Sequence, residues 1–372
     1  MRENWDYGVL EDAVKKGSSN ISLNKVKNDE GEYPLFSAKG FNKNISFFQQ
    51  EKEYLGIIKD GAGIGRVSKH PAKSSIVATM QYLIPKDGFE IGFIEYFLNG
   101  IDFEKHRNGS TIPHIYFKDY KSERFPLLPL PEQKRIVSIL DKAFSVIERS
   151  RNNAEQNLKN AKELFESYLQ GVFENKGGDW EEKTLGDICE IIGGGTPSKK
   201  NEAFYDGDIL WATVRDMKVD IIENTEHKIT YDAVKKSSTN IIPKENVIIA
   251  TRVGLGKVCL LKNDTAINQD LKGIIPKKQK QLSVDFLFRW FKSISKKIID
   301  EGTGATVQGV KLAFINSLQI LLPSIKEQKQ IVQKLDTLQS ETKKLELIYQ
   351  QKMNDLEELK KSVLQKAFNG EL

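Results

Sequence analysis

The sequence contains two closely similar segments, and this repeat constrains the fold more than any other feature. The first copy reads Glu-Gln-Lys-Arg-Ile-Val from Glu132, and the second reads Glu-Gln-Lys-Gln-Ile-Val from Glu327. The correspondence continues at a constant separation to Leu-Gln-x-x-Phe, which ends at Phe173 and at Phe368. Both copies are rich in Glu, Lys, Gln and Leu, which favour helix, and neither contains proline beyond its first residues. The sequence therefore predicts two related long helices, in 131–176 and 324–372.

Apolar residues recur along both stretches at spacings of three and four. This period is typical of a narrow helical stripe sustained over several heptads, as in a coiled coil. Two unrelated amphipathic surface helices are the alternative, but the shared text argues against it. A tandem repeat that closes on itself favours antiparallel pairing. The residues that we expect to pair the helices or bind a partner are Ile136, Leu140, Ile147, Leu158, Phe165, Ile331, Leu335, Leu345, Leu356 and Val363.

The segments before the two helices, 1–130 and 177–323, read as mixed α/β blocks that repeat one plan. A glycine-rich turn follows an apolar run in both blocks, in 57–67 and 247–258. A later Gly-Ser/Thr loop occurs in 109–113 and 304–308. The chain is thus a pseudo-twofold tandem duplication of α+β class, with blocks far more diverged than helices. We expect the hinge between the halves at 176–178.

The composition excludes several classes of protein. The two cysteines provide no disulfide framework or metal spacing, and the four histidines form no metal or triad pattern, so each histidine is expected on a loop or surface. No phosphate-binding loop, dinucleotide fingerprint or nucleophile elbow is present. A catalytic site is therefore not expected, and neither is a metal or cofactor bound by this chain. With no apolar run long enough to span a bilayer and no signal-peptide core, we expect a cytoplasmic protein.

The net charge of +5 is spread evenly along the chain, so bulk charge alone does not indicate nucleic-acid binding. The loops of both blocks nevertheless combine glycine with cationic, amide and hydroxyl side chains, which suit base edges and phosphates. For each residue, an ordinary turn is the alternative. The DNA-binding candidates are Lys59, Arg66, Ser110, Thr111, Thr196, Ser198, Lys199, Thr213, Arg215, Arg252, Lys257, Asn268, Gln269, Thr306 and Gln308.

The whole chain resembles the specificity subunit of Type I restriction–modification systems. The resemblance rests on 129–137 with 169–173 and on 322–332 with 364–368, and the chain departs from its own repeat where Ile325-Lys326 replaces Leu130-Pro131. It implies two target recognition domains, each reading one half of a split double-stranded DNA sequence. The two long helices would pack antiparallel as a spacer and bind two modification subunits. S-adenosylmethionine would belong to the modification subunit, and ATP and Mg to the restriction subunit.

Two other interpretations stay open at this stage. One is a coiled-coil adaptor with two peptide- or RNA-binding blocks, and the other is a fused nuclease or methylase, which the missing motifs make a poor match. A methyltransferase gene beside this one would favour the specificity subunit.

The apolar spacing of the first helix is interrupted at Arg149-Ser-Arg-Asn-Asn153. We predict that four residues inserted here, about one turn and ~6 Å of rise, lengthen the unread spacer of the methylated sequence by one or two base pairs. Both half-sites should stay the same, because the recognition loops are untouched. Methylation mapping of wild type and variant side by side checks this. An unchanged spacer in an active complex would show that the helices do not set it.

Overall fold

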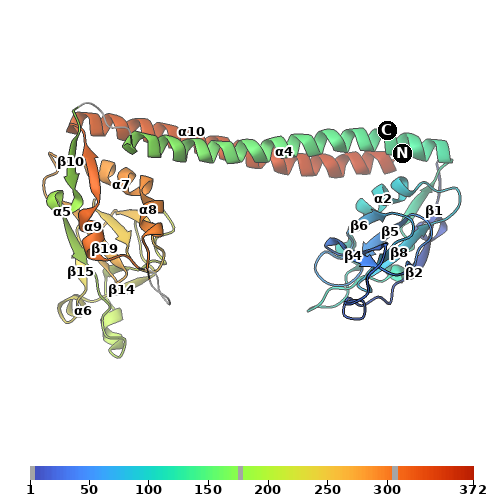
Figure 1. Ribbon diagram of the computed structural model, residues 1–372, viewed down its shortest axis with the longest axis horizontal. Helices are drawn as coiled ribbons and strands as arrows, with labels where there is room; N and C mark the ends of the chain where they lie inside the picture. The colour runs from blue at the N-terminus through green and yellow to red at the C-terminus, as the bar shows by residue number, and fades with distance from the viewer. Residues whose placement is uncertain (1–4, 175–178, 304–308) are drawn as a thin grey trace. The chain divides into compact units, whose positions relative to one another are not determined.

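The computed structural model of the chain describes residues 5–174, 179–303 and 309–372. The predicted hinge at 176–178 and the candidates Thr306 and Gln308 lie outside these residues. The chain divides into two compact units (Figure 1): unit 1 is Met1–Gln156 with Tyr349–Leu372, and unit 2 is Asn157–Ile348. This division cuts both long helices, α4 (Leu130–Glu174) and α10 (Ile325–Phe368), whereas the sequence predicted them as segments of their own.

Unit 1 contains three small sheets that precede α4. Strands β2, β8, β5 and β6 pair in that order and are antiparallel, β4 pairs with β3 and β3 with β7, and β1 pairs with β9. The elements before α4 are β1 (Asp6–Val9), α1 (Leu10–Ala13), β2 (Val14–Ser18), β3 (Tyr33–Ser37), β4 (Gly40–Ile45), β5 (Tyr54–Ile58), β6 (Val67–His70), β7 (Ser75–Ile76), β8 (Met80–Pro85), α2 (Ile91–Asn99), the 3₁₀ helix η1 (Phe103–His106), α3 (Phe117–Tyr120) and β9 (Arg124–Leu127).

Unit 2 repeats this plan with additional short strands. Its main sheet has the order β11-β19-β16-β17-β13, a second has the order β14-β12-β18-β15, and β10 pairs with β20. The elements are β10 (Glu181–Thr184), α5 (Leu185–Ile188), β11 (Cys189–Gly193), the 3₁₀ helix η2 (Glu202–Tyr205), β12 (Ile209–Ala212), β13 (Ile221–Ile222), β14 (His227–Ile229), α6 (Tyr231–Lys235), β15 (Asn240–Ile242), β16 (Val247–Ala250), β17 (Val258–Leu261), β18 (Thr265–Ile267), β19 (Leu271–Pro276), α7 (Val284–Ser293), α8 (Ser295–Asp300), α9 (Leu312–Ser317) and β20 (Gln319–Leu322).

The glycine turns predicted in both blocks close the β5–β6 and β16–β17 hairpins. Gly65 and Gly256 adopt positive φ angles of 81° and 80°, a region that suits glycine. A Cβ atom at Gly65 would lie 2.5 Å from Phe103, and one at Gly256 would lie 2.6 Å from Ser295. Backbone conformation and close packing therefore both require glycine at these two aligned positions.

The long helices pair antiparallel within each unit. In unit 1, Ile136 from the start of α4 shares a core with Leu364 from the end of α10, and further along Arg151 pairs with Glu357 at 2.8 Å. In unit 2, Phe173 from the end of α4 shares a core with Leu335 from the start of α10. The predicted class is confirmed: two α/β blocks with long helices that pair antiparallel. α4 also continues as helix through 149–153, where its apolar spacing is interrupted.

The predicted helix-pairing residues differ in how far they are covered. Leu345 is 41% exposed, so its side chain is not buried in the pair; Thr342, nearby on α10, is buried instead. Among the others, Ile136, Leu140, Ile147 and Leu335 are buried, and Leu158, Phe165, Ile331, Leu356 and Val363 are half-buried.

A glutamine in the first turn of each long helix fastens that helix to its α/β block. Both Gln133 and Gln328 are 0% exposed. The Gln133 amide donates to the carbonyls of Leu128 at 2.7 Å and Gly88 at 3.1 Å, and its oxygen accepts the Glu90 N–H at 2.8 Å. Glu90 is the N-cap of α2, so this amide ties together the entry to α4 and the start of α2.

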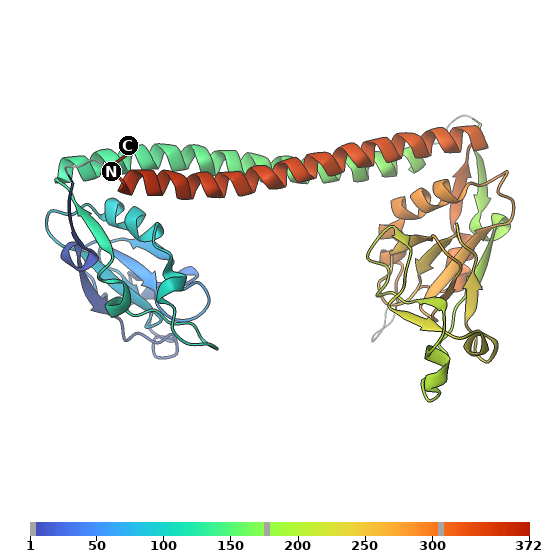
Figure 2. The same ribbon diagram turned by 180° about the vertical axis from the view of Figure 1, so that it is seen from behind.

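Gln328 makes the matching set of bonds in unit 2. Its amide donates to the carbonyls of Pro323 at 3.0 Å and Gln281 at 2.8 Å, and its oxygen accepts the Ser283 N–H at 2.9 Å. Ser283 is the N-cap of α7. In both views α7 lies between the strands of unit 2 and the long helices (Figure 1 and Figure 2). The repeated Glu-Gln-Lys text therefore marks a buried joint between helix and block.

We predict that Gln328→Ala lowers the free energy of unfolding of unit 2 by roughly 2–4 kcal/mol, because it leaves a buried N–H and two carbonyls without their partner. The matched control is Gln330→Ala, an exposed glutamine two residues along the same helix, with an expected effect within about 0.5 kcal/mol. Urea unfolding followed by tryptophan fluorescence checks this, since Trp180, Trp211 and Trp290 all lie in unit 2. Equal losses for the two variants would contradict the role of the amide.

Candidate nucleic-acid interface

The loops that follow β11, β12 and β18 in unit 2 meet around one pocket of about 740 Å³. Figure 1 shows β14 and α6 at the end of unit 2 opposite the long helices, and His227 of β14 lines this pocket. The other lining residues that bear polar side chains are Thr196, Lys199, Tyr205, Trp211, Thr213, Arg215, Asn268, Gln269 and Asp270. Six of the sequence-predicted residues are thus brought together: Thr196, Lys199, Thr213, Arg215, Asn268 and Gln269.

One wall of the pocket is organised by the carboxylate of Asp270. It accepts hydrogen bonds from the Asn268 amide at 3.1 Å and the Gln269 amide at 3.3 Å, and it lies 3.5 Å from the Arg252 guanidinium. The hydroxyl of Thr196 donates to the side-chain oxygen of Gln269. This cluster joins predicted residues from three loops that are distant in the sequence; Thr196, Asn268 and Gln269 line the pocket, and Arg252 contacts Asp270 from outside the lining.

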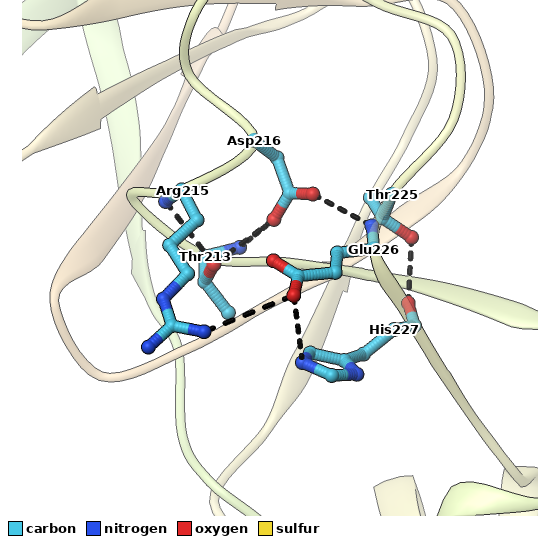
Figure 3. A network of polar contacts seen from close by, with 6 residues as sticks. All are labelled: Thr213, Arg215, Asp216, Thr225, Glu226 and His227. Atoms are coloured by element: carbon cyan, nitrogen blue, oxygen red, sulfur yellow. Dashed lines mark hydrogen bonds and ion pairs between the residues drawn. The ribbon is translucent and has the colours of Figure 1, made fainter. Parts of the chain in front are cut away.

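A second polar network is organised by the carboxylate of Asp216 and includes Thr213 and Arg215, which line the pocket (Figure 3). It accepts hydrogen bonds from the backbone N–H of Thr213 at 2.7 Å, the Thr213 hydroxyl at 3.0 Å and the backbone N–H of Glu226 at 2.7 Å. The same hydroxyl accepts the Arg215 N–H at 3.2 Å. The Arg215 side chain extends from this ordered turn and is 76% exposed, 3.8 Å from the Glu226 carboxylate.

The other described candidates of unit 2, Arg252, Lys257 and Ser198, are outside the lining of the pocket. Lys257 donates to the carbonyl of Val214, a lining residue, at 3.5 Å, so the glycine turn borders the pocket. Ser198 is exposed and does not line it.

Sequence reasoning missed the acidic members of this site. Asp216 and Asp270 each follow a predicted candidate within one residue, and that adjacency was the available signal. His227, expected on a loop or surface, is exposed at the start of β14, where it lines the pocket. The carboxylates act through hydrogen bonds to neighbours, a role that composition does not reveal.

In unit 1 the candidates lie around the equivalent glycine turn. Lys59 pairs with Asp60 at 3.7 Å, and Asp60 accepts a hydrogen bond from His114 at 2.7 Å. Ser110 and Thr111 are exposed in the loop closed by the pairing of Asn108 with His114. In unit 2, Thr303 and Gly309 form the equivalent antiparallel bridge.

Arg66 lines a separate pocket of about 320 Å³ in unit 1 and donates to the carbonyl of Ala38 at 3.3 Å. Phe41, which is largely exposed, and Lys69 share this lining. Burial lowers the pKa of His70, another lining residue, to about 4, so its ring is neutral at pH 7. The structure therefore does not gather Lys59, Arg66, Ser110 and Thr111 into one pocket.

Within the described part of the chain, no group of three or more His, Cys, Asp or Glu side chains is arranged to hold a metal ion. Of the helices in the described ranges, none is both long and apolar enough to cross a membrane.

Comparison with known proteins identifies the family. The family model described as the Type I restriction modification DNA specificity domain matches residues 2–159 and 177–357. This match spans most of the chain and includes both globular blocks, so the chain belongs to the Type I restriction–modification DNA specificity family. The resemblance found in the sequence is confirmed.

Individual relatives agree with this assignment. The specificity subunit of the Type I restriction enzyme EcoR124I/EcoR124II of Escherichia coli is 32% identical over 259 residues, covering 66% of this chain and 62% of that subunit. The match thus spans less than two thirds of that relative's length. A chain solved in work on complex assembly and conformational transition of the type I R-M system aligns over 100% of this chain and 99% of its own, with a TM-score of 0.80 at 17% identity. The HsdS subunit from Thermoanaerobacter tengcongensis aligns over 100% and 98%, with a TM-score of 0.64 at 16% identity. These two likenesses show the fold.

We predict that Asp216→Ala loosens the turn that carries Arg215. Hydrogen bonds to a charged acceptor contribute about 1.5–3 kcal/mol, so exchange of the Thr213 and Glu226 amide protons should accelerate about tenfold or more. Hydrogen exchange of the full chain measures this. Asp232→Ala is the control, because the exposed Asp232 carboxylate on α6 pairs with Lys236, the residue after that helix. Unchanged exchange at Thr213 and Glu226 would show that Asp216 does not order the turn.

Proposed function

We propose that this chain supplies DNA sequence recognition to a Type I restriction–modification complex, with each unit reading one half of a bipartite double-stranded target. The observation that carries the proposal is that the two units repeat the same loop backbone but present different side chains on it. In both units a glycine turn lies beside a loop closed by an equivalent β-bridge, Asn108–His114 or Thr303–Gly309. At these loops unit 1 presents Lys59, Asp60 and His114, whereas unit 2 presents Arg252 and its neighbours.

The chemistry of the unit 2 pocket suits a base edge. Arginine binds the two acceptors of guanine, and asparagine or glutamine binds adenine in the major groove. Lys199 and Lys257 are cations that suit phosphate, which positions a protein on the duplex without reading sequence. The even charge of the chain fits a subunit that shares phosphate contacts with its partners.

The proposal assigns catalysis to other subunits. Two modification subunits would bring S-adenosylmethionine and the methyl-transfer site, and the restriction subunit would bring ATP and Mg. The long helices would set the spacer and bind the modification subunits. Exposed apolar residues on α10 support this docking role, since Leu347 is 72% exposed and Ile348 is 58% exposed. The proposed location is the cytoplasm, where DNA and the partner subunits meet.

The test is base-resolution methylation mapping of the full chain assembled with its modification subunit. Wild type should methylate one split sequence. Arg252→Ala should relax discrimination at one position of one half-site by about 1–3 kcal/mol, and Arg66→Ala should affect the other half-site. Arg252→Lys is the control, because lysine keeps the charge for a phosphate contact but loses the two-pronged geometry.

Three results would contradict the proposal. The first is a wild-type complex that methylates no defined sequence. The second is a pair of variants, Arg252→Ala and Arg66→Ala, that alter the same half-site. The third is binding of the chain to RNA or peptide in preference to duplex DNA.

A further inference from the structure

The two units provide an internal comparison at the glycine turn. In unit 1 the N–H groups of Lys59 and Asp60 donate to the carbonyl of Thr79, at 3.1 Å and 3.3 Å. In unit 2 the N–H groups of Thr251 and Arg252 donate to the carbonyl of Asp270, at 2.9 Å and 3.3 Å. The backbone contact is the same in both units.

The strand register confirms that Asp270 in unit 2 is structurally equivalent to Thr79 in unit 1. Ile58 pairs with Met80 at the end of the β5–β8 ladder, and Ala250 pairs with Leu271 at the end of the β16–β19 ladder. Thr79 and Asp270 each precede the last paired residue. Thr79 is exposed, and unit 1 forms this turn without a carboxylate at that position. The Asp270 side chain is therefore not required to build the turn.

That side chain instead contacts three candidate base-reading residues. It is 14% exposed, and it holds the Asn268 and Gln269 amides while facing the Arg252 guanidinium. An ionised carboxylate only accepts hydrogen bonds, so both amides must turn their NH₂ groups toward it. Its charge also keeps the guanidinium at the edge of the pocket. The Asp270 carboxylate thus contacts all three groups, while the Asp270 backbone N–H donates to the Asn268 oxygen at 3.1 Å and the Thr196 hydroxyl donates to the Gln269 oxygen.

We propose that Asp270 is a positioning residue that determines the base specificity of unit 2, and that the cluster it orients reads guanine. The Arg252 side chain is 51% exposed and faces Asp270 through one nitrogen, Nη1, so its other N–H groups are directed elsewhere. Gln269 keeps a second amide proton beyond the one that it shares with Asp270. The free groups are donors, and guanine presents two acceptors, O6 and N7, in the major groove. This inference rests on the proposed function.

The experiment replaces Asp270 with the residue that unit 1 uses, as Asp270→Thr, in the full chain assembled with its modification subunit. Methylation mapping should show guanine specified at one position of one half-site in the wild type. In the variant, discrimination at that position should fall roughly tenfold to hundredfold, with the other half-site unchanged. Asp270→Asn, which keeps an acceptor oxygen but not the charge, should restore part of the discrimination.

Asp264→Ala is the matched control. Asp264 directly precedes β18, whereas Asp270 follows it, and the Asp264 carboxylate accepts the Lys244 N–H at 2.8 Å. It should leave the methylated sequence unchanged, and thermal unfolding shows whether each variant remains folded.

The outcomes separate this inference from the proposed function. A wild-type complex that methylates no defined sequence overturns both. A defined bipartite target that stays the same in Asp270→Thr and Asp270→Asn overturns the positioning role alone. A relaxed position that specifies a base other than guanine overturns the assignment of the base. If Asp270→Thr fails to fold, an unchanged sequence in the folded Asp270→Asn complex overturns the positioning role as well.

Discussion

The buried amide of a glutamine at the start of each long helix is the contact on which the arrangement of each unit depends. A fully buried amide is tolerated only when its donors and acceptor are satisfied. Gln133 and Gln328 meet this condition by joining three segments: the strand exit before the helix, the loop after the main sheet and the N-cap of α2 or α7. Any shift of the helix relative to its block would break several hydrogen bonds at once. Each α/β block is thereby held in one orientation on its own part of the helix pair.

A second contact in each unit reinforces this joint with different chemistry. The Tyr96 hydroxyl of α2 donates to Asp141 of α4 at 2.6 Å, and Arg289 of α7 pairs with Asp336 of α10. The two aspartates occupy matching positions of the repeat, whereas their partners on the short helices differ. The long helices thus keep the accepting aspartates that fasten the blocks, while each block supplies a different donor. This explains in physical terms how helices can stay alike within one chain while the blocks diverge.

The loops of the two units show the complementary behaviour. Their backbone hydrogen bonds repeat, because the strand register and the glycine turns fix the frame. Their side chains do not repeat: the position of Arg252 in unit 2 is taken by Asp60 in unit 1, so the sign of the charge is reversed. A frame that is independent of its exposed side chains can present different recognition chemistry at no cost to folding. Such a frame suits a protein that must read two different half-sites.

The sequence by itself determined the duplicated architecture, the long helices and the glycine turns, because these depend on local periodicity, helix-forming residues and backbone conformations that glycine favours. It also placed Thr196, Thr213, Arg215, Asn268 and Gln269 among the candidates, since their residue types suit base edges. Only the tertiary structure showed that these residues line one pocket, that Asp270 lines it with them, and that Asp216 holds Thr213 by hydrogen bonds. It also showed that the pocket lined by Arg66 includes neither Lys59 nor Ser110, and that Leu345 is left exposed. These facts depend on contacts between segments far apart in the chain. Such contacts are set by strand pairing and loop packing. The identity of a single residue does not reveal which distant residues it will contact.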